Sequence, residues 1–168
     1  MKRFLIGFVI LALGMGLSFG LSQSKASEAE APPVQPIAFS HVIHAADNQI
    51  PCQYCHVYVR RSFVAGVPSV ERCMGCHRMI EKNSPEIEKL KGYWKRKEAI
   101  PWVKVNDLPD FVRFPHKRHI AKEIACTRCH GPVKTMEVVR KGPVQKMPDC
   151  VQCHRAEKAS IDCWTCHK

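Results

Sequence analysis

The chain has 168 residues and ten cysteines, and 26 lysines and arginines against 15 aspartates and glutamates give it a formal charge of +11. It holds seven phenylalanines, three tyrosines and three tryptophans, and much of its other apolar content lies in one N-terminal run. These numbers exclude a domain built around a large apolar core. A chain with so little apolar material of its own usually needs a covalent or metal cross-link.

The first element in chain order is the apolar run of residues 4–21, FLIGFVILALGMGLSFGL, which follows the basic start Met1-Lys2-Arg3. Eighteen residues of helix are about 27 Å long, close to the hydrocarbon thickness of a bilayer. We expect residues 1–22 to form a single transmembrane helix. A cleaved signal peptide, with its cleavage site near Ser24-Lys25-Ala26, is the alternative. Residues 23–36 are rich in small, charged and proline residues and are predicted to form a flexible linker.

Both interpretations of the N-terminal run give the rest of the chain the same location. The basic start stays in the cytoplasm, so everything after residue 22 is exported. Since a retained helix is the favoured interpretation, we predict a protein of the cytoplasmic membrane, with its functional part on the periplasmic or extracellular side.

All ten cysteines occur in Cys-x-x-Cys pairs, and a histidine follows each pair directly. Cys-x-x-Cys-His is the attachment signature of c-type haem. Two thiols at this spacing reach the two vinyl groups on one edge of a porphyrin, and the adjacent histidine offers a ring nitrogen to the iron. The pattern predicts five haem c groups, each with two attachment cysteines and a proximal histidine: Cys52, Cys55 and His56; Cys73, Cys76 and His77; Cys126, Cys129 and His130; Cys150, Cys153 and His154; and Cys163, Cys166 and His167.

Zinc ribbons and disulfides are the structural alternatives for paired cysteines. Zinc ribbons combine two pairs, so five pairs leave one unmatched, and tetrahedral zinc gives no reason for a histidine after every pair. A disulfide framework in an exported protein accounts for the cysteines but not for the five histidines. Five haems is therefore the favoured interpretation.

The four remaining histidines lie in two matching segments placed ahead of haem motifs, Phe39-Ser40-His41-Val42-Ile43-His44 and Phe114-Pro115-His116-Lys117-Arg118-His119. A His-x-x-His pair on one helical turn presents two imidazoles as neighbours. That arrangement suits the irons of two adjacent haems, or a single zinc, and a lone exposed histidine often has no role at all. We expect all four to be distal iron ligands: His41, His44, His116 and His119.

Five irons need five distal ligands, and the histidines supply four. Methionine is the usual other ligand in c-type cytochromes, and it raises the reduction potential. Outside the apolar run the candidates are Met74, Met79, Met136 and Met147. Met147, three residues before Cys150, is the favoured choice and Met136 the second. Two further interpretations stay open, namely a five-coordinate iron and methionines that only fill gaps in the core.

The spacing of the motifs reveals a duplication. Residues 37–80 form a predicted two-haem module and residues 114–168 a three-haem module. The connector, residues 81–113, is predicted to begin with a helix capped by Ser84 that ends before Pro101 and to continue as extended chain. The expected fold is mostly irregular, with short α-helices packed around five covalent haems, little strand, and the N-terminal transmembrane helix.

The three-haem module resembles the three-haem cytochromes c7 of class III, which share its Phe-x-His-x-x-His opening and motif spacing. In that family the first histidine of the pair serves the first haem and the second serves the next. A further histidine, shortly before the second motif, serves the third haem, and methionine stands at its place here. The resemblance implies these ligand pairs: His116 with His130, His119 with His154, His41 with His56, His44 with His77, and Met147 with His167.

The whole chain resembles the pentahaem cytochrome c subunit of bacterial alternative complex III, a quinol-oxidising membrane complex. The apolar start and the five motifs in order carry this likeness, together with Ile100-Pro101-Trp102-Val103, Leu108-Pro109-Asp110-Phe111-Val112, and Cys129-His130-Gly131-Pro132-Val133 with Met136. The resemblance implies integral quinol-oxidising subunits and an iron–sulfur subunit as partners. It also implies a monohaem cytochrome or a similar protein as the electron acceptor.

The basic charge does not indicate nucleic-acid binding, because the acid groups of five haems would nearly balance it and no nucleic-acid-binding motif occurs. We expect a relay of electrons from a quinol-oxidising complex to a downstream acceptor, with no catalytic site of its own. The alternatives are a soluble periplasmic electron shuttle and a multihaem reductase with one open iron. The Cys-x-x-Cys-Lys motif that marks the open haem of pentahaem nitrite reductases does not occur in the chain.

Overall fold

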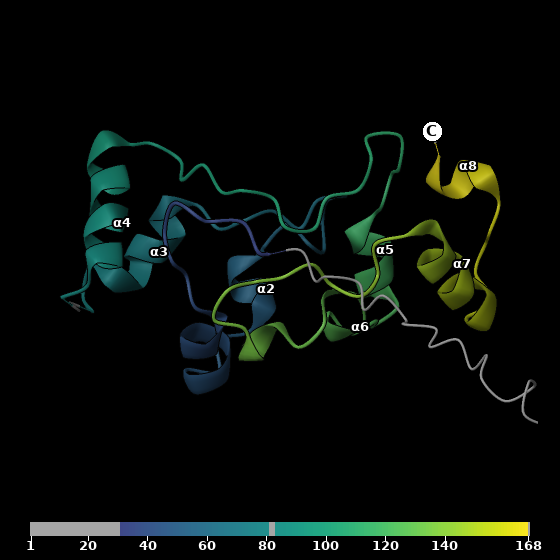
Figure 1. Ribbon diagram of the computed structural model, residues 1–168, viewed down its shortest axis with the longest axis horizontal. Helices are drawn as coiled ribbons and strands as arrows, with labels where there is room; N and C mark the ends of the chain where they lie inside the picture. Colours follow the sequence, from purple (N-terminus) through teal and green to yellow (C-terminus); the bar gives the residue numbers. More distant parts are fainter. Residues whose placement is uncertain (1–30, 81–82, 168) are drawn as a thin grey trace, which may run out of the picture. The chain divides into compact units, whose positions relative to one another are not determined.

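Short helices separated by irregular segments make up the protein in a computed structural model, which describes residues 31–80 and 83–167 (Figure 1). In chain order they are η1 (Val42–Asp47), α2 (Cys52–Cys55), α3 (Val70–His77), α4 (Pro85–Arg96), α5 (His116–Ala121), α6 (Thr127–His130), η2 (Val133–Thr135), α7 (Met147–Ala156) and α8 (Cys163–Cys166). The β-structure of these ranges is one isolated antiparallel bridge, between Val112 and His167. The expectation of short helices with little strand agrees with this arrangement.

The expected transmembrane helix requires a correction. No helix within residues 31–80 or 83–167 is long and apolar enough to cross a membrane. α4 has 12 residues, whereas a span needs about 20 predominantly apolar ones. Residues 1–22, to which the expectation applied, lie outside the described residues. The single-pass anchor, and the location at the cytoplasmic membrane that depended on it, are therefore not supported.

α4 begins as the sequence predicts. The Ser84 hydroxyl accepts a hydrogen bond from the Glu86 N–H at 3.3 Å, and Pro85 occupies the first helical position, where its missing N–H costs nothing. The helix ends at Arg96, because Lys97 adopts a left-handed conformation with φ 55°. The start of the helix therefore follows from local sequence, and its end before Pro101 agrees with the expectation.

A small apolar core joins α3 to α4. Ile37, Met74, Leu90 and Ile100 form it, each with at most 8% of its surface exposed. Met74 therefore has the gap-filling role common for methionine in cores. No apolar side chain after residue 100 is buried in the part of the chain that the structure describes. The segment that contains three of the five haem motifs thus lacks an apolar core of its own.

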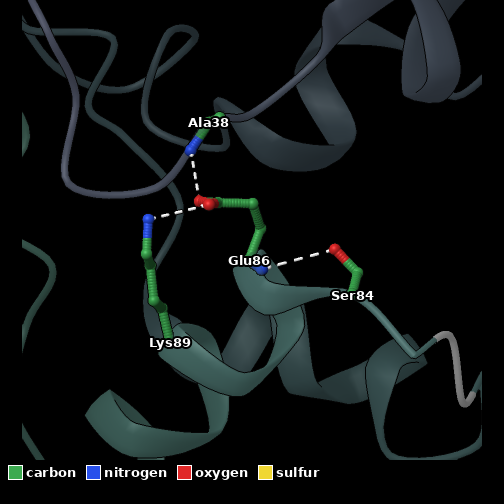
Figure 2. A network of polar contacts seen from close by, with 4 residues as sticks. All are labelled: Ala38, Ser84, Glu86 and Lys89. Carbon is green, nitrogen blue, oxygen red and sulfur yellow. Dashed lines mark hydrogen bonds and ion pairs between the residues drawn. The ribbon is translucent and has the colours of Figure 1, made fainter.

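α4 also holds the segment that leads into the first histidine pair. The Glu86 carboxylate accepts a hydrogen bond from the Ala38 N–H at 2.6 Å and pairs with the Lys89 ammonium at 2.7 Å (Figure 2). The Lys89 ammonium first, and the Ala38 N–H second, hold the pKa of the Glu86 carboxyl below its usual range. Since Ala38 directly precedes Phe39, these bonds tie the histidine-bearing segment to the start of α4.

The connector is hydrogen-bonded to the chain just ahead of the two-haem module and to the three-haem module. Gln35 and Val103 exchange two hydrogen bonds of 2.9 Å, so the chain is tied to the connector within the stretch predicted as linker. Farther along, the Asn106 side-chain oxygen accepts hydrogen bonds from the Gly142 N–H and the Gln145 amide, both at 2.9 Å. The connector therefore positions the chain ahead of the first and the fourth haem motifs.

Candidate haem-ligand sites

Each Cys-x-x-Cys pair lies on or at the start of one short helix: α2, α3, α6, α7 or α8. One helical turn brings the two thiols and the following histidine of a motif close together. No disulfide joins any of the ten cysteines, all of which lie within the described residues. Within residues 31–80 and 83–167, no group of three or more His, Cys, Asp or Glu side chains is arranged to hold a metal ion. The described cysteines are thus not arranged as a disulfide framework or as a zinc site.

Thiols of different motifs are neighbours in a definite order. In each of four pairs, burial raises the pKa of the first thiol and the neighbouring thiol raises it further: Cys73 next to Cys55, Cys126 next to Cys52, Cys129 next to Cys153, and Cys150 next to Cys166. These neighbours link the second motif to the first, the first to the third, the third to the fourth, and the fourth to the fifth. In Figure 1 the helices that carry them, α3, α2, α6, α7 and α8, follow one another in the same order.

Three of the histidine pairs that the cytochrome c7 resemblance implies face each other at one spacing. A first-row metal lies about 2 Å from a ligating imidazole nitrogen, so two rings on opposite sides of one iron have centroids roughly 6 Å apart. The observed centroid distances are 6.3 Å for His116 and His130, 6.1 Å for His44 and His77, and 6.0 Å for His119 and His154. The spacing therefore suits an iron between the rings of each pair.

The fourth implied pair is His41 with His56. Burial first, and then the neighbouring His56 and His44, lower the pKa of His41 to about 4. His41 is therefore a neutral imidazole at neutral pH, which is the form that binds a metal. Its Nδ1 is buried and has no hydrogen-bond partner among the described residues.

Backbone carbonyls accept a hydrogen bond from the ring Nδ1–H of five histidines. A carbonyl oxygen can only accept, so Nδ1 carries the proton and Nε2 keeps its lone pair. Metal-ligating histidines are oriented by such bonds, which also raise the basicity of the ligating nitrogen. The pairs are His44 with Ser40 (2.8 Å), His56 with Gly66 (2.6 Å), His116 with Phe63 (2.6 Å), His119 with Pro115 (3.0 Å) and His154 with Ser160 (2.6 Å). These rings fit a haem iron that is bound through Nε2.

Two phenylalanines pack against the predicted distal histidines, a contact that the sequence pattern alone does not specify. Phe39 stacks on His44 with centroids 4.3 Å apart and meets His41 edge-on at 4.9 Å. Phe114 makes the same two contacts with the histidines of its own segment, at 4.3 and 4.8 Å. The sequence feature that could have indicated these contacts is the phenylalanine two positions before each His-x-x-His pair. The duplicated sequence thus has a duplicated ring geometry.

His167, the histidine of the fifth motif, has different surroundings. Phe111 stacks on its ring with centroids 5.7 Å apart and planes 30° apart. Beside it, Val112 forms the isolated β-bridge with His167, and the Arg113 N–H donates to the Cys166 carbonyl at 2.8 Å. The end of the connector therefore holds the last motif in place.

The two methionine candidates for the fifth distal ligand lie in different places. Met147 begins α7, and 65% of its side chain surface is exposed. The methyl group of Met136 lies 3.7 Å from the position of a Cβ at Gly131, directly after His130. That contact places Met136 beside the third motif. The choice of Met147 for the fifth motif, with Met136 second, stays a prediction.

Comparison with known proteins gives matches in both halves of the chain. Residues 112–168 match the family described as cytochrome c7 and related cytochrome c, and residues 20–103, half of the chain, match the class III cytochrome c family. The chain is also 28% identical to the multihaem cytochrome c subunit of menaquinone reductase from Nitratidesulfovibrio vulgaris (strain Hildenborough). That match covers 80% of this chain and 77% of the relative. Likeness to alternative complex III is not confirmed by these matches.

The family assignment and the ligand geometry agree. Cytochromes c hold haem by thioether bonds from Cys-x-x-Cys-His motifs, and this chain presents such motifs beside facing imidazoles. The chain belongs to the class III cytochrome c family: it is a multihaem cytochrome c that binds haem c covalently and takes part in electron transfer.

Proposed function

We propose that the chain is a five-haem electron relay and a subunit of a complex that reacts with quinones. The observation that carries this proposal is the set of facing histidines at 6.0–6.3 Å beside Cys-x-x-Cys-His motifs. Imidazoles on both faces leave an iron without an open position. A site of this kind suits electron transfer better than chemistry on a bound substrate.

The neighbouring thiols support one path through the relay, from the second motif through the first, third and fourth to the fifth. When bound, each haem supplies an iron that can take up and release an electron. The cysteines hold each group at a set place along the path. The histidines and the carbonyls behind them keep the ligands in one orientation, and the identity of the axial ligands sets the potentials.

The menaquinone reductase relative supports a partner protein that handles quinones. Its name favours electron flow toward the quinone, opposite to the direction implied by the resemblance to a quinol-oxidising complex. Integral subunits that react with the quinone, an iron–sulfur subunit of the same complex and a monohaem cytochrome or similar protein remain the predicted partners.

Intact-mass spectrometry of the purified mature protein tests the haem count. We expect the mass of the chain to be increased by five haem c groups, with all ten cysteines resistant to alkylation. The control is the same chain produced without the cytochrome c maturation machinery, which should have the bare polypeptide mass and ten reactive thiols. A smaller haem increment, or reactive thiols in the mature protein, would contradict the proposal.

Purification of the protein in mild detergent from its native membranes and extracts tests the partner. A co-purifying polypeptide that restores electron exchange between the haems and a menaquinone analogue is the expected result. Isolation of the chain alone, with its haems unable to exchange electrons with the analogue in whole extract, would exclude the quinone-linked role.

A further inference from the structure

The segment Ser62–Gly66, which follows α2 in the two-haem module, contacts histidines of two different predicted haem sites. Its Gly66 carbonyl accepts the Nδ1–H of His56, the proximal ligand at the first motif, at 2.6 Å. Its Phe63 carbonyl accepts the Nδ1–H of His116, the distal ligand at the third motif, also at 2.6 Å. One segment of five residues thus orients ligands of two irons.

The attachment of this segment to the second module does not depend on one hydrogen bond. The Phe63 carbonyl also accepts the backbone N–H of His116 at 3.3 Å, and the Ser62 carbonyl accepts the N–H of Lys117 at 3.4 Å. The Lys117 ammonium lies 5.8 Å from the centre of the Phe63 ring, within range of a cation–π contact. The start of α5 is therefore docked on the segment by main-chain and side-chain contacts.

The conformation of the segment depends on glycine at its end. Gly66 has φ +72°, in the region that other residues rarely adopt, and a Cβ there would lie 3.0 Å from the Tyr58 ring. At the other end, the Tyr58 carbonyl accepts the N–H groups of Arg61 and Ser62 at 2.9 and 2.8 Å. The glycine at one end and the hydrogen-bonded turn at the other therefore hold the Phe63 and Gly66 carbonyls in position.

A carbonyl bound to Nδ1–H makes the opposite nitrogen a stronger electron donor to a metal. Stronger donation stabilises the oxidised iron and lowers its reduction potential. The effect would act on the first and third haems together, because their ligands share the segment. By contrast, Nδ1 of His41, on the other side of the first iron, has no hydrogen-bond partner within the described ranges.

We propose that Ser62–Gly66 is a shared ligand clamp, which sets the orientation and basicity of His56 and His116 and so couples the potentials of the first and third haems. This inference depends on the proposed haem ligation. Cys52 of the first motif neighbours Cys126 of the third, so the two predicted modules meet at these two motifs, and the segment contacts histidines of both.

The variant Gly66→Ala tests the clamp in the full haem-loaded protein, because a side chain at this backbone conformation displaces the segment. We expect two of the five reduction potentials to rise together in potentiometry, while the other three keep their values. The EPR signal of one low-spin iron with nearly parallel imidazoles should also change, because the rings of His116 and His130 are 9° apart.

Gly92→Ala on α4 is the matched control. An added Cβ there would meet only the flexible end of the Arg96 side chain, at 3.1 Å, so all five potentials should stay unchanged. In Gly66→Ala, a shift of one potential, of all five or of none would overturn the clamp. The haem increment in the mass spectrum separates the two proposals, because a count below five contradicts the relay itself and an intact count without a paired shift contradicts only the clamp.

A second measurement uses the wild-type protein and does not depend on folding of the variant. Low-spin iron(II) is diamagnetic, so the histidine ring N–H protons of the reduced protein are accessible to nitrogen-edited NMR. The Nδ1–H protons of His56 and His116 should resonate at lower field than that of His41, because a hydrogen bond to a carbonyl deshields the proton. Equal chemical shifts for all three protons would overturn the clamp.

Discussion

In residues 39–44 and in residues 114–119, a phenylalanine stacks on the second histidine and meets the first edge-on at nearly equal distances. The second histidine of each segment donates its Nδ1–H to the carbonyl four residues earlier. The first histidines differ, since His116 donates to Phe63 in the other module, whereas Nδ1 of His41 is buried without a partner in the described part of the chain. Repeated sequence thus repeats the local ring packing, while the surroundings decide how the first ring is held.

The two segments also differ in the parts of the chain that hold them in place. The first segment continues as the π-helix η1 and is tied through Ala38 to Glu86 at the start of α4. The second continues as the regular helix α5 and is docked on Phe63. The same ligand motif can therefore be placed by a neighbouring helix or by a loop beside another haem motif.

Removal of a distal ligand from each segment should have the largest effect. His41→Ala and His116→Ala should each leave one five-coordinate iron, so the reduced protein should bind carbon monoxide at that haem. The corresponding His→Met variants, which keep a ligand, should bind much less. Carbon monoxide binding that stays at the wild-type level in either alanine variant would show that its segment does not supply that ligand.

The methionine predicted to serve the fifth motif is the next test, because the two segments are predicted to supply only four of the five distal ligands. Met147→His should lower the potential of one haem by a sizeable part of the roughly 0.8 V range that axial ligands span, and leave the others in place. Met79→His is the control, since Met79 is 82% exposed and is not a predicted ligand. A potentiometric titration without a selective drop would exclude Met147.

Because the ring packing is nearly the same in the two segments, substitution of either phenylalanine should lower the free energy of unfolding by the same amount. Phe39→Leu and Phe114→Leu each remove a stacked and an edge-on contact, so each should lower the free energy of unfolding by about 0.5–1.5 kcal/mol. Chemical denaturation of the haem-loaded protein measures this loss. Val34→Ala, at an apolar side chain that is 92% exposed, serves as the control. A large loss of unfolding free energy in one variant and none in the other would show that the two phenylalanines do not play equivalent roles.

Loss of the contacts that tie only the first segment, residues 39–44, to α4 should have the smallest effect on stability. Glu86→Gln weakens the bonds to Lys89 and Ala38 and should cost about 0.5–1 kcal/mol in the free energy of unfolding. Glu88→Gln, which disrupts an exposed pair with Lys91 on the same helix, is the control and should cost less.

The effect of Glu86→Gln should depend on pH in a defined direction. The pKa of the Glu86 carboxyl lies below its ordinary value of 4.5 in the folded chain. A depressed carboxyl pKa stabilises the fold above the ordinary value, and that contribution is lost as the pH falls through the folded pKa. The difference between wild type and variant should therefore be full at neutral pH and disappear in acid. An unchanged difference at low pH would mean that the charge of Glu86 is not involved.

Local sequence determined the parts of this protein that depend on spacing over a few residues. The Cys-x-x-Cys-His motifs, the paired histidines and the cap of α4 at Ser84 could all be predicted, because one helical turn decides which side chains are neighbours. The ligand pairs at roughly 6 Å agree with those implied by resemblance to the cytochromes c7. The expectation of a membrane helix went beyond what spacing could support, and the described chain does not bear it out.

Only the tertiary structure decided which backbone segments hydrogen-bond to the predicted ligand histidines. It also decided the order of the haem motifs in space. Phe63 meets His116 across 53 residues of sequence, and no local pattern marks a backbone carbonyl as the partner. Gly142 packs so closely on the third motif that an added Cβ would collide with the Cys129 carbonyl and lie 2.8 Å from the Cα of His130. Such contacts arise when distant segments share one small space, so the sequence alone leaves them undetermined and folding decides them.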